Sequence, residues 1–376
     1  MRKKRARKRS ALSKSKQKPD YIFILLILVL TVFGLVMVFD ASVIEGYQEF
    51  QDKFHFLKLQ SIWAAIGFIG LLIASIVPFK LYEKLAQPIF LFALVLLIAV
   101  LIPGIGIKAQ GARRWINLGF TVFQPSELTK LAVIIYLSSW LSKHQRFAPF
   151  LFITGTILGL IMLQPDLGTA IIIGSIAFVL FFVSGGSIKH ILFGGIGAAA
   201  LALILIVSSP YRMNRLKTFL DPSSDPLGTS YHIRQVLIAL GSGGLTGQGI
   251  GKSRQKYQYL PEASTDSIFA IIAEETGFVG GVFVIGMLVY LVNRGLKIAS
   301  RAPDEFSQLL VSGIITWVGV QSLINLAAMV ALVPLTGVPL PLISYGGSSL
   351  TTILIALGII ANVSRFQVKV VKNNRS

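Results

Sequence analysis

The stretch YIFILLILVLTVFGLVMVF, residues 21–39, is nineteen residues long and carries no charge. A helix of about 20 apolar residues is long enough to cross the hydrocarbon core of a bilayer. Hydrophobic residues make up 54% of the 376-residue chain, and charged residues only 14%. Ordinary soluble domains carry roughly 25% charged residues, so this chain has too few charges to cover a water-facing surface. The composition excludes an ordinary soluble enzyme and indicates a membrane protein.

The segment before this stretch is strongly basic. Residues 1–20 hold ten of the 35 Lys and Arg residues and a single acid, Asp20. Such a segment cannot bury apolar surface, so we expect a disordered cytoplasmic tail that touches anionic membrane lipid. It lacks interleaved aromatic residues, so we expect no nucleic-acid partner. No small-residue cleavage site follows residue 39, which predicts a retained signal anchor.

Nine further apolar stretches follow the first. They cover about residues 59–77, 85–102, 128–141, 150–164, 168–184, 190–209, 268–291, 308–331 and 350–364. An even number of spans places both termini on one side, where the loops and tails hold 22 Lys and Arg against 12 on the other. Seven of those 12 fall in residues 210–267, a long segment in which the positive-inside rule counts least.

We therefore predict an all-α integral membrane protein, a bundle of ten transmembrane helices with both termini cytoplasmic. A large extracytoplasmic loop is expected between helices 7 and 8. The predicted organisation is a basic tail over residues 1–20, a transmembrane domain over 21–366 and a cytoplasmic C-terminal tail over 367–376.

Several classes of function are disfavoured by what the sequence lacks. There is no cysteine, which removes disulfides and thiolate metal sites. The GxxxxGKS, HExxH and GxSxG motifs are absent, which argues against an ATP-driven pump on this chain alone. The long loops at 103–127, 210–267 and 333–349 all fall on the predicted outer side. Because long loops are usually functional, we expect extracytoplasmic chemistry.

Five segments carry a resemblance to a known family. They are GARRWINLG (111–119), QPSELTK (124–130), QPDLGTA (164–170), GSGGLTGQGIGKSRQKYQYLPEASTDSIFAIIAEETG (241–277) and PLTGVPLPLISYGGSSL (334–350). These segments resemble the signature blocks of the SEDS family, the shape, elongation, division and sporulation proteins FtsW, RodA and SpoVE. The resemblance extends over nearly the whole chain from residue 20. DPSSDPLGTSYHIRQ (221–235) and NVSRF (362–366) are more similar to the division and sporulation members than to RodA.

The resemblance implies a peptidoglycan glycosyltransferase of the bacterial cytoplasmic membrane that polymerises lipid II on its outer face. It also implies partners, namely a class B penicillin-binding protein transpeptidase and other divisome or elongation proteins. Two alternatives stay open on the residues alone: a lipid-linked sugar flippase or transporter, and a non-catalytic division scaffold.

Asp266, in the segment LPEASTD, is the candidate general base. An α-linked donor that gives a β-linked product reacts with inversion, which needs one base and stabilisation of the leaving diphosphate. Asp266 lies where the long outer segment meets the next span, and partial desolvation there would raise its pKa. Local sequence alone favours a helix N-cap instead. The resemblance places the catalytic aspartate of the family at Asp266, with Glu262 as a second acid or a loop charge.

Two pairs of charged residues are candidates for substrate binding. Arg113 and Arg114 precede Trp115, and guanidinium groups bind diphosphate bidentately, although ordinary interfacial anchoring is the alternative. Glu127 and Lys130 are three residues apart and share one helix face. Charges at this depth are usually functional, but an ion pair that holds the bundle together is equally consistent with the spacing.

The remaining candidates come from two turns. Asp166 follows Pro165 and could cap a helix that starts near Gly168, while the resemblance implies an important acid here, so Asp166 is the second catalytic candidate. Ser344, Gly346 and Gly347 are expected to pack closely around a substrate groove.

The sequence offers little evidence for a metal or cofactor. No residue cluster demands a metal, and the one candidate cofactor is a divalent cation, Mg²⁺ or Mn²⁺, that bridges the diphosphate. Glu274 and Glu275 lie inside a predicted span, one expected as a paired structural charge and the other on a polar pathway. Three residues depart from the family pattern: Ser267 replaces an aromatic residue, His232 replaces glutamine, and Val236 replaces serine.

Overall fold

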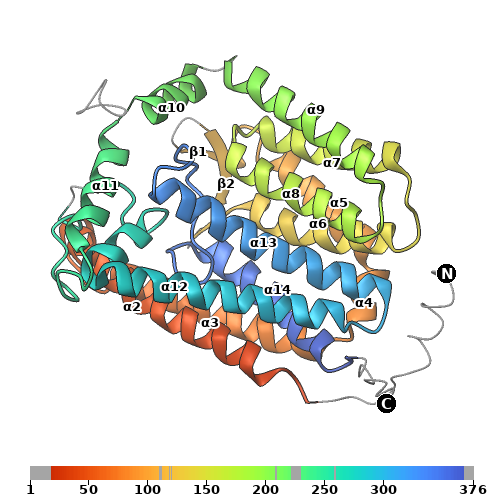
Figure 1. The fold of residues 1–376 in the computed structure, drawn as a ribbon, viewed down its shortest axis with the longest axis horizontal. Helices are drawn as coiled ribbons and strands as arrows, with labels where there is room; N and C mark the ends of the chain where they lie inside the picture. Colours follow the sequence, from red (N-terminus) through yellow and green to blue (C-terminus); the bar gives the residue numbers. More distant parts are fainter. Residues whose placement is uncertain are drawn as a thin grey trace, which may run out of the picture.

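The protein is a bundle of helices with one small sheet (Figure 1). The computed structural model describes residues 18–109, 112–117, 119, 121–207, 210–221, 230–257 and 260–367. The predicted basic tail is described only from Lys18 onward, and the predicted C-terminal tail only at Gln367. The expectations for both tails therefore lie outside the described residues.

A helix lies over each of the apolar stretches predicted from the sequence. These helices are α2 (Tyr21–Phe50), α3 (His55–Ile76), α5 (Ala86–Ala99), α6 (Pro125–Leu141), α7 (Phe147–Met162), α8 (Leu167–Val183), α9 (Ile188–Val207), α12 (Ile268–Ser300), α13 (Glu305–Met329) and α14 (Gly347–Ser364). The short helix α4 (Phe79–Lys84) precedes α5.

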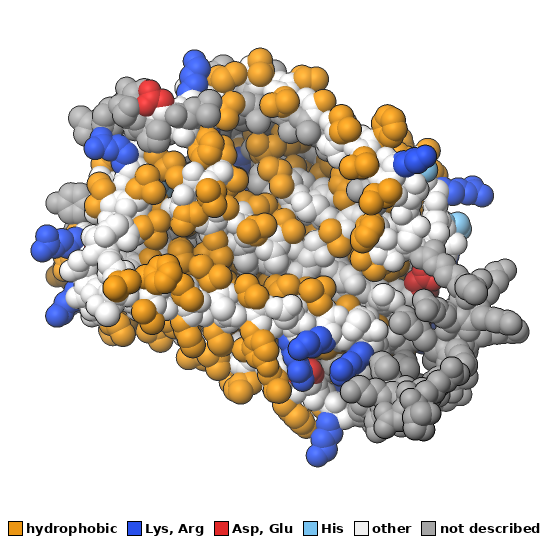
Figure 2. All heavy atoms as spheres, in the orientation of Figure 1, with side chains coloured by type: hydrophobic (Ala, Val, Ile, Leu, Met, Phe, Trp, Pro, Cys, Tyr) orange, Lys and Arg blue, Asp and Glu red, His pale blue; other side chains and the backbone are white. Residues whose placement is uncertain are grey.

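Five of these helices, α2, α3, α12, α13 and α14, are long and apolar enough to cross a membrane. The helices α5, α7 and α8 are apolar but shorter. Figure 2 shows hydrophobic side chains spread over the flank of the bundle, with Lys and Arg gathered toward its ends. This distribution is that of a multi-pass membrane protein, in which the apolar flank faces lipid.

The first helix is longer than predicted. It begins after Asp20, whose carboxylate accepts a hydrogen bond from the Phe23 amide at 3.1 Å, and it continues to Phe50 rather than to residue 39. A 30-residue helix is about 45 Å long, so α2 extends beyond the hydrocarbon core. The charge at Asp40 does not end the helix, because its carboxylate is paired with Lys256 at 2.9 Å.

Two predicted loops contain regular structure. Residues 103–127 hold a three-stranded antiparallel sheet, so the all-α prediction is wrong here. Its strands are β1 (Gly106–Ala109), β2 (Ala112–Asn117) and β3 (Val122–Phe123). The turn after β2 is held by the Asn117 side chain, which accepts from the amide of Gly119 at 2.8 Å. The long segment 210–267 contains α10 (Pro210–Leu220) and α11 (Tyr231–Gly243).

The described termini meet at one end of the bundle, which we call the terminal end. The Asp20 amide donates to the Ser364 hydroxyl at 3.0 Å, and the Arg294 guanidinium donates to the Asp20 carboxylate at 2.8 Å. Helices α6, α8 and α12 begin at the opposite end, where α13 finishes. We call this opposite end, with the sheet, α11 and residues 251–257, 260–267 and 333–346, the loop end (Figure 1).

Gly34 lets α2 approach the loop end closely. A methyl group at Gly34 would lie 2.5 Å from the Leu342 carbonyl oxygen and 2.7 Å from the Ile343 Cα. Because these neighbours are backbone atoms, they cannot rotate away. The glycine therefore permits direct contact between α2 and the chain that leads into α14.

We predict that Gly34→Ala lowers the free energy of unfolding by about 1–3 kcal/mol, because the methyl group overpacks this contact. Thermal denaturation of the detergent-purified protein measures the change. The matched control is Gly155→Ala in α7, where the added methyl would meet no described atom within 4 Å. Equal melting temperatures for the two variants would contradict the proposed contact.

Candidate functional site

Asp266 lies at the loop end, directly before α12. The N-cap residue of α12 is Ser267, so the prediction that Asp266 caps this helix is wrong. The Asp266 residue is 8% exposed, and the Thr265 hydroxyl lies 3.4 Å from its Oδ1. Burial, reinforced by the negative charge of Glu262, raises the pKa of Asp266 to about 7. A carboxyl group with this pKa can accept a proton near neutral pH.

The chain segment 335–339, which we call the strap, lies against Asp266. The side-chain amide of Asn325 donates to the carbonyl oxygens of Asp266 at 2.7 Å and Val338 at 2.8 Å. Gly337 adopts a φ of +69°, and a methyl group there would lie 3.9 Å from Asp266 Oδ2. A glycine suits this position because its backbone is left-handed. The strap thus faces the Asp266 carboxylate with its backbone.

Two charged residues flank this carboxylate. Arg215 in α10 donates to the Leu335 carbonyl oxygen at 2.8 Å, and its positive charge lowers the pKa of Asp266. This effect is smaller than that of burial. Glu262, predicted as a second acid or a loop charge, accepts a hydrogen bond from the Thr265 hydroxyl at 2.7 Å.

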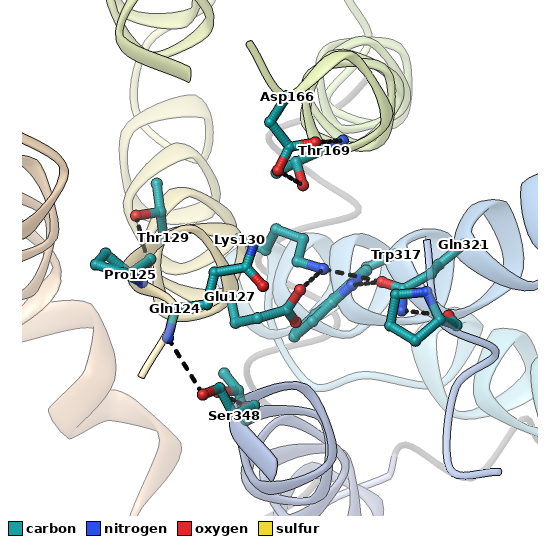
Figure 3. A network of polar contacts seen from close by, with 12 residues as sticks. Gln124, Pro125, Glu127, Thr129, Lys130, Asp166, Thr169, Trp317, Gln321 and Ser348 are labelled. Carbon is teal, nitrogen blue, oxygen red and sulfur yellow. Dashed lines mark hydrogen bonds and ion pairs between the residues drawn. The ribbon is translucent and has the colours of Figure 1, made fainter. Parts of the chain in front are cut away.

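Glu127 and Lys130 form a buried ion pair on α6, as their spacing indicated. The Lys130 Nζ lies 2.8 Å from Glu127 Oε1 and 2.9 Å from Gln321 Oε1 (Figure 3). It also lies 4.9 Å from the centre of the Trp317 ring. Glu127 Oε2 is buried and has no hydrogen-bond partner among the described residues. The pair therefore keeps one free acceptor.

Gln321 connects this ion pair to the strap. Its amide donates to the Pro339 carbonyl oxygen at 2.9 Å, while its oxygen accepts from Lys130 and from the Trp317 indole. We did not predict Trp317, Gln321 or Asn325. Their spacing of four residues places them on one face of α13. This stripe of polar residues in an apolar helix is the feature of the sequence that could have predicted them.

Asp166 caps α8, as predicted. Its carboxylate accepts from the Thr169 amide at 3.0 Å and from the Thr169 hydroxyl at 2.9 Å (Figure 3). Arg114 in β2 donates to the carbonyl oxygens of Gln164 at 2.9 Å and Pro165 at 2.5 Å. Arg114 therefore holds the turn that presents Asp166, and Arg113, the preceding residue, is half-buried.

The start of α8 also packs on the strap. A methyl group at Gly168 would lie 2.6 Å from a side-chain carbon of Val338. Asp166 and Asp266, the two catalytic candidates, therefore flank the same segment.

Ser344, Gly346 and Gly347 lie where the chain after the strap enters α14. The Gln60 side chain donates to the Ser344 carbonyl oxygen and accepts from the Gly346 amide, both at 3.2 Å. The Ser344 hydroxyl accepts from the Leu340 amide at 2.8 Å, and Gly347 packs on the Trp63 indole. These contacts shape the backbone, and a direct role of the three residues in binding stays a prediction.

His232 and Ser267, which depart from the family pattern, contact each other. The His232 Nε2 lies 2.7 Å from the Ser267 hydroxyl oxygen. Burial lowers the pKa of His232 to about 4, so the imidazole is neutral at pH 7. Two of the three departures thus form a single contact between α11 and the start of α12, beside Asp266.

Among the described residues, no cluster of three or more His, Asp or Glu side chains is suited to a metal ion. Mg²⁺ or Mn²⁺ at the diphosphate stays a prediction that no arrangement of these side chains supports.

The chain belongs to the FtsW/RodA/SpoVE family, since the model of this family, described as "Cell cycle protein", matches residues 20–369. It is 41% identical over 343 residues to the probable peptidoglycan glycosyltransferase FtsW of Trichlorobacter lovleyi, covering 89% of this chain and 90% of that protein. It is 41% identical over 345 residues to stage V sporulation protein E of Bacillus subtilis, covering 90% and 94%.

One solved structure extends the likeness to three dimensions. It is described as "Structural coordination of polymerization and crosslinking by a peptidoglycan synthase complex", and one of its chains is 30% identical to this chain with a TM-score of 0.77. The alignment covers 92% of this chain and 98% of that chain.

We predict that Lys130→Met lowers the free energy of unfolding by about 3–5 kcal/mol, because it leaves the Glu127 carboxylate buried without its cation. The double variant Glu127→Gln/Lys130→Met should recover much of this loss. Thermal denaturation in detergent measures both.

The matched control is Lys143→Met, which breaks an ion pair with Glu83 in which the lysine side chain is 58% exposed. An exposed pair contributes little, so the melting temperature should hardly change. A Lys130→Met protein that melts like the wild type would refute a stabilising role for the buried pair.

Proposed function

We propose that this protein is a peptidoglycan glycosyltransferase that polymerises lipid II on the outer face of the bacterial cytoplasmic membrane. The observation that carries the proposal is the buried carboxyl of Asp266, with its pKa near 7, in a chain of this family. We further propose ten membrane spans with both termini cytoplasmic, which places the loop end and the large loop between spans 7 and 8 outside.

In the proposed reaction, Asp266 acts as the general base. The proton of the acceptor hydroxyl moves to the Asp266 carboxylate while the acceptor oxygen bonds to the anomeric carbon of the lipid-linked donor. The bond from that carbon to the diphosphate breaks, and the lipid diphosphate leaves with the electron pair from the opposite face. One base without a covalent intermediate gives inversion at the anomeric carbon.

The leaving diphosphate needs cations and hydrogen-bond donors. We assign this role to Arg113 and Arg114 at the sheet and to Lys130. The free Glu127 Oε2 offers an acceptor for a sugar hydroxyl. Both carboxylate oxygens of Asp166 are engaged by Thr169, so we assign Asp166 the role of fixing the start of α8 against the strap.

The placement of buried charge favours this function over transport. A transporter of a charged lipid needs polar groups through the depth of the bilayer. The buried charged residues of the described chain are Glu127, Lys130, Asp166, Lys256, Asp266, Glu274 and Glu275. All of them lie near the loop end, which fits catalysis at one face.

The proposed partner is a class B penicillin-binding protein, a transpeptidase that crosslinks the new strands. The structural relative described above is a chain of a complex that coordinates polymerisation with crosslinking. Similarity to both FtsW and a sporulation protein supports a role with divisome proteins.

We predict that Asp266→Asn slows lipid II polymerisation by about 10²- to 10⁴-fold, because the amide cannot accept the proton. Purified protein is incubated with lipid II, and glycan strands are resolved by gel electrophoresis. The control Asp52→Asn removes an acid that is paired with the exposed Lys58, and should keep full activity. Wild-type activity in the Asp266→Asn protein would overturn the assignment of the base.

The pH dependence follows from the raised pKa. The base must be ionised to work, so kcat/KM should rise with pH through about 7 and level off above it. Glu262→Gln removes a negative charge that raises the pKa of Asp266, so the midpoint should move to lower pH. A profile that is flat through neutral pH would contradict this expectation.

A further inference from the structure

A second group of buried charges lies near the loop end, outside the site described above. Lys256 precedes Asp266 by ten residues, and its side chain is 4% exposed. Its Nζ lies 2.9 Å from Asp40 Oδ1 in α2 and 3.0 Å from Glu275 Oε1 in α12. One ammonium group therefore joins two helices to the segment that leads to Asp266.

The turn just before Lys256 is bound to α12 as well. The amides of Gly251 and Ser253 donate to the two carboxylate oxygens of Glu275 at 2.9 and 3.0 Å. The Arg254 amide donates to Glu274 Oε1 at 3.0 Å, and the Ser253 hydroxyl donates to Glu274 Oε2. Both glutamates thus bind this turn, so the prediction that one of them lines a polar pathway is wrong.

Backbone contacts reinforce the attachment at a kink in α12. Gly277 has a φ of +69°, which interrupts the helix. Around it, the Gly249 amide donates to the Glu275 carbonyl oxygen at 3.0 Å, and the Phe278 amide donates to the Gly244 carbonyl oxygen at 2.9 Å. The kink therefore provides the surface on which residues 244–249 are held.

These contacts close a loop whose two ends are fixed to the same helix. Its first end is held at Glu274 and Glu275, about two turns into α12, and its second end continues from Asp266 into the start of α12. The Leu260 amide donates to the Gln255 carbonyl oxygen at 3.0 Å, which ties the two parts of the loop together. Residues 251–257 and 260–267 are therefore anchored to α12 and to each other.

We propose that Lys256, held between Asp40 and Glu275, is a positioning residue that sets the place and the burial of Asp266. It does so by fixing the segment of residues 260–266, which we call the catalytic segment. The inference rests on the proposed function of Asp266 as the base. A displacement of about 1 Å at a catalytic group can slow a reaction about 100-fold. A residue that fixes the segment carrying Asp266 can therefore affect the rate without touching the substrate.

The test is the double variant Asp40→Asn/Lys256→Met, which removes both charges and leaves Glu275 with its two amide donors. Lys256→Arg is the conservative variant, since it keeps the cation. The matched control is Asp52→Asn/Lys58→Met, which removes an ion pair of similar length, 2.7 Å, whose lysine is 65% exposed. The measurements are hydrogen–deuterium exchange of the folded proteins and the pH profile of lipid II polymerisation.

In the double variant, exchange should rise far more in residues 260–267 than in the rest of the described chain, beyond any general rise from leaving the Glu275 carboxylate buried without its cation. The kcat should fall about 10- to 100-fold with little change in KM. As water reaches Asp266, the midpoint of the pH profile should fall below about 7, toward a value set by its neighbours Glu262 and Arg215. Lys256→Arg and the control should resemble the wild type.

Unchanged exchange and an unchanged pH profile in the folded double variant would overturn the proposal. Exchange that rises by the same factor over the whole chain, with no excess in residues 260–267, would also overturn it, because Lys256 would then support general stability rather than the catalytic segment. Failure of the proposed function would give another result. The Asp266→Asn variant would then keep its activity, independently of how fast residues 260–267 exchange in the double variant.

Discussion

The side-chain amide of Asn325 donates to the carbonyl oxygens of Asp266 and Val338, and the candidate site depends on these two hydrogen bonds. They hold the carboxylate segment against the strap of residues 335–339. Carbonyl oxygens of the strap also accept hydrogen bonds from Gln321 of α13 and Arg215 of α10. The start of α8 packs against the strap. The Asn325 amide thus ties the Asp266 segment to Val338, the residue on which the start of α8 packs.

Lipid imposes a second constraint, because a buried polar group without a partner costs several kcal/mol. The protein meets it by placing buried charges where helices begin and by giving them backbone or side-chain partners. Lys130 lies between Glu127 and Gln321. The carboxylates of Glu274 and Glu275 accept hydrogen bonds from backbone amides of the turn before Lys256. Asp266 differs from these groups: its carboxylate has no cation partner at hydrogen-bond distance among the described residues, the Thr265 hydroxyl lies 3.4 Å away, and burial raises its pKa.

The helices and the family could be predicted because hydrophobic runs and rare motifs are local properties of the sequence. The Glu127–Lys130 pair and the Asp166 cap were predictable for the same reason, since each spans only three residues. The contacts of Asn325 and the pairing of Asp40 with Lys256 were not, because they join residues 59 and 216 positions apart. The small sheet was missed because its strands are short and lie among glycines.

The stereochemistry of the product tests whether Asp266 acts as a general base without a covalent intermediate. A single ionisable carboxyl that acts as a base converts an α-linked donor into a β-linked strand, whereas a covalent intermediate would retain the configuration. The measurement is the anomeric configuration, by NMR, of glycan strands that the purified protein makes from lipid II. We expect β linkages throughout. Strands with α linkages, or no strands from a preparation shown to be folded, would contradict this expectation.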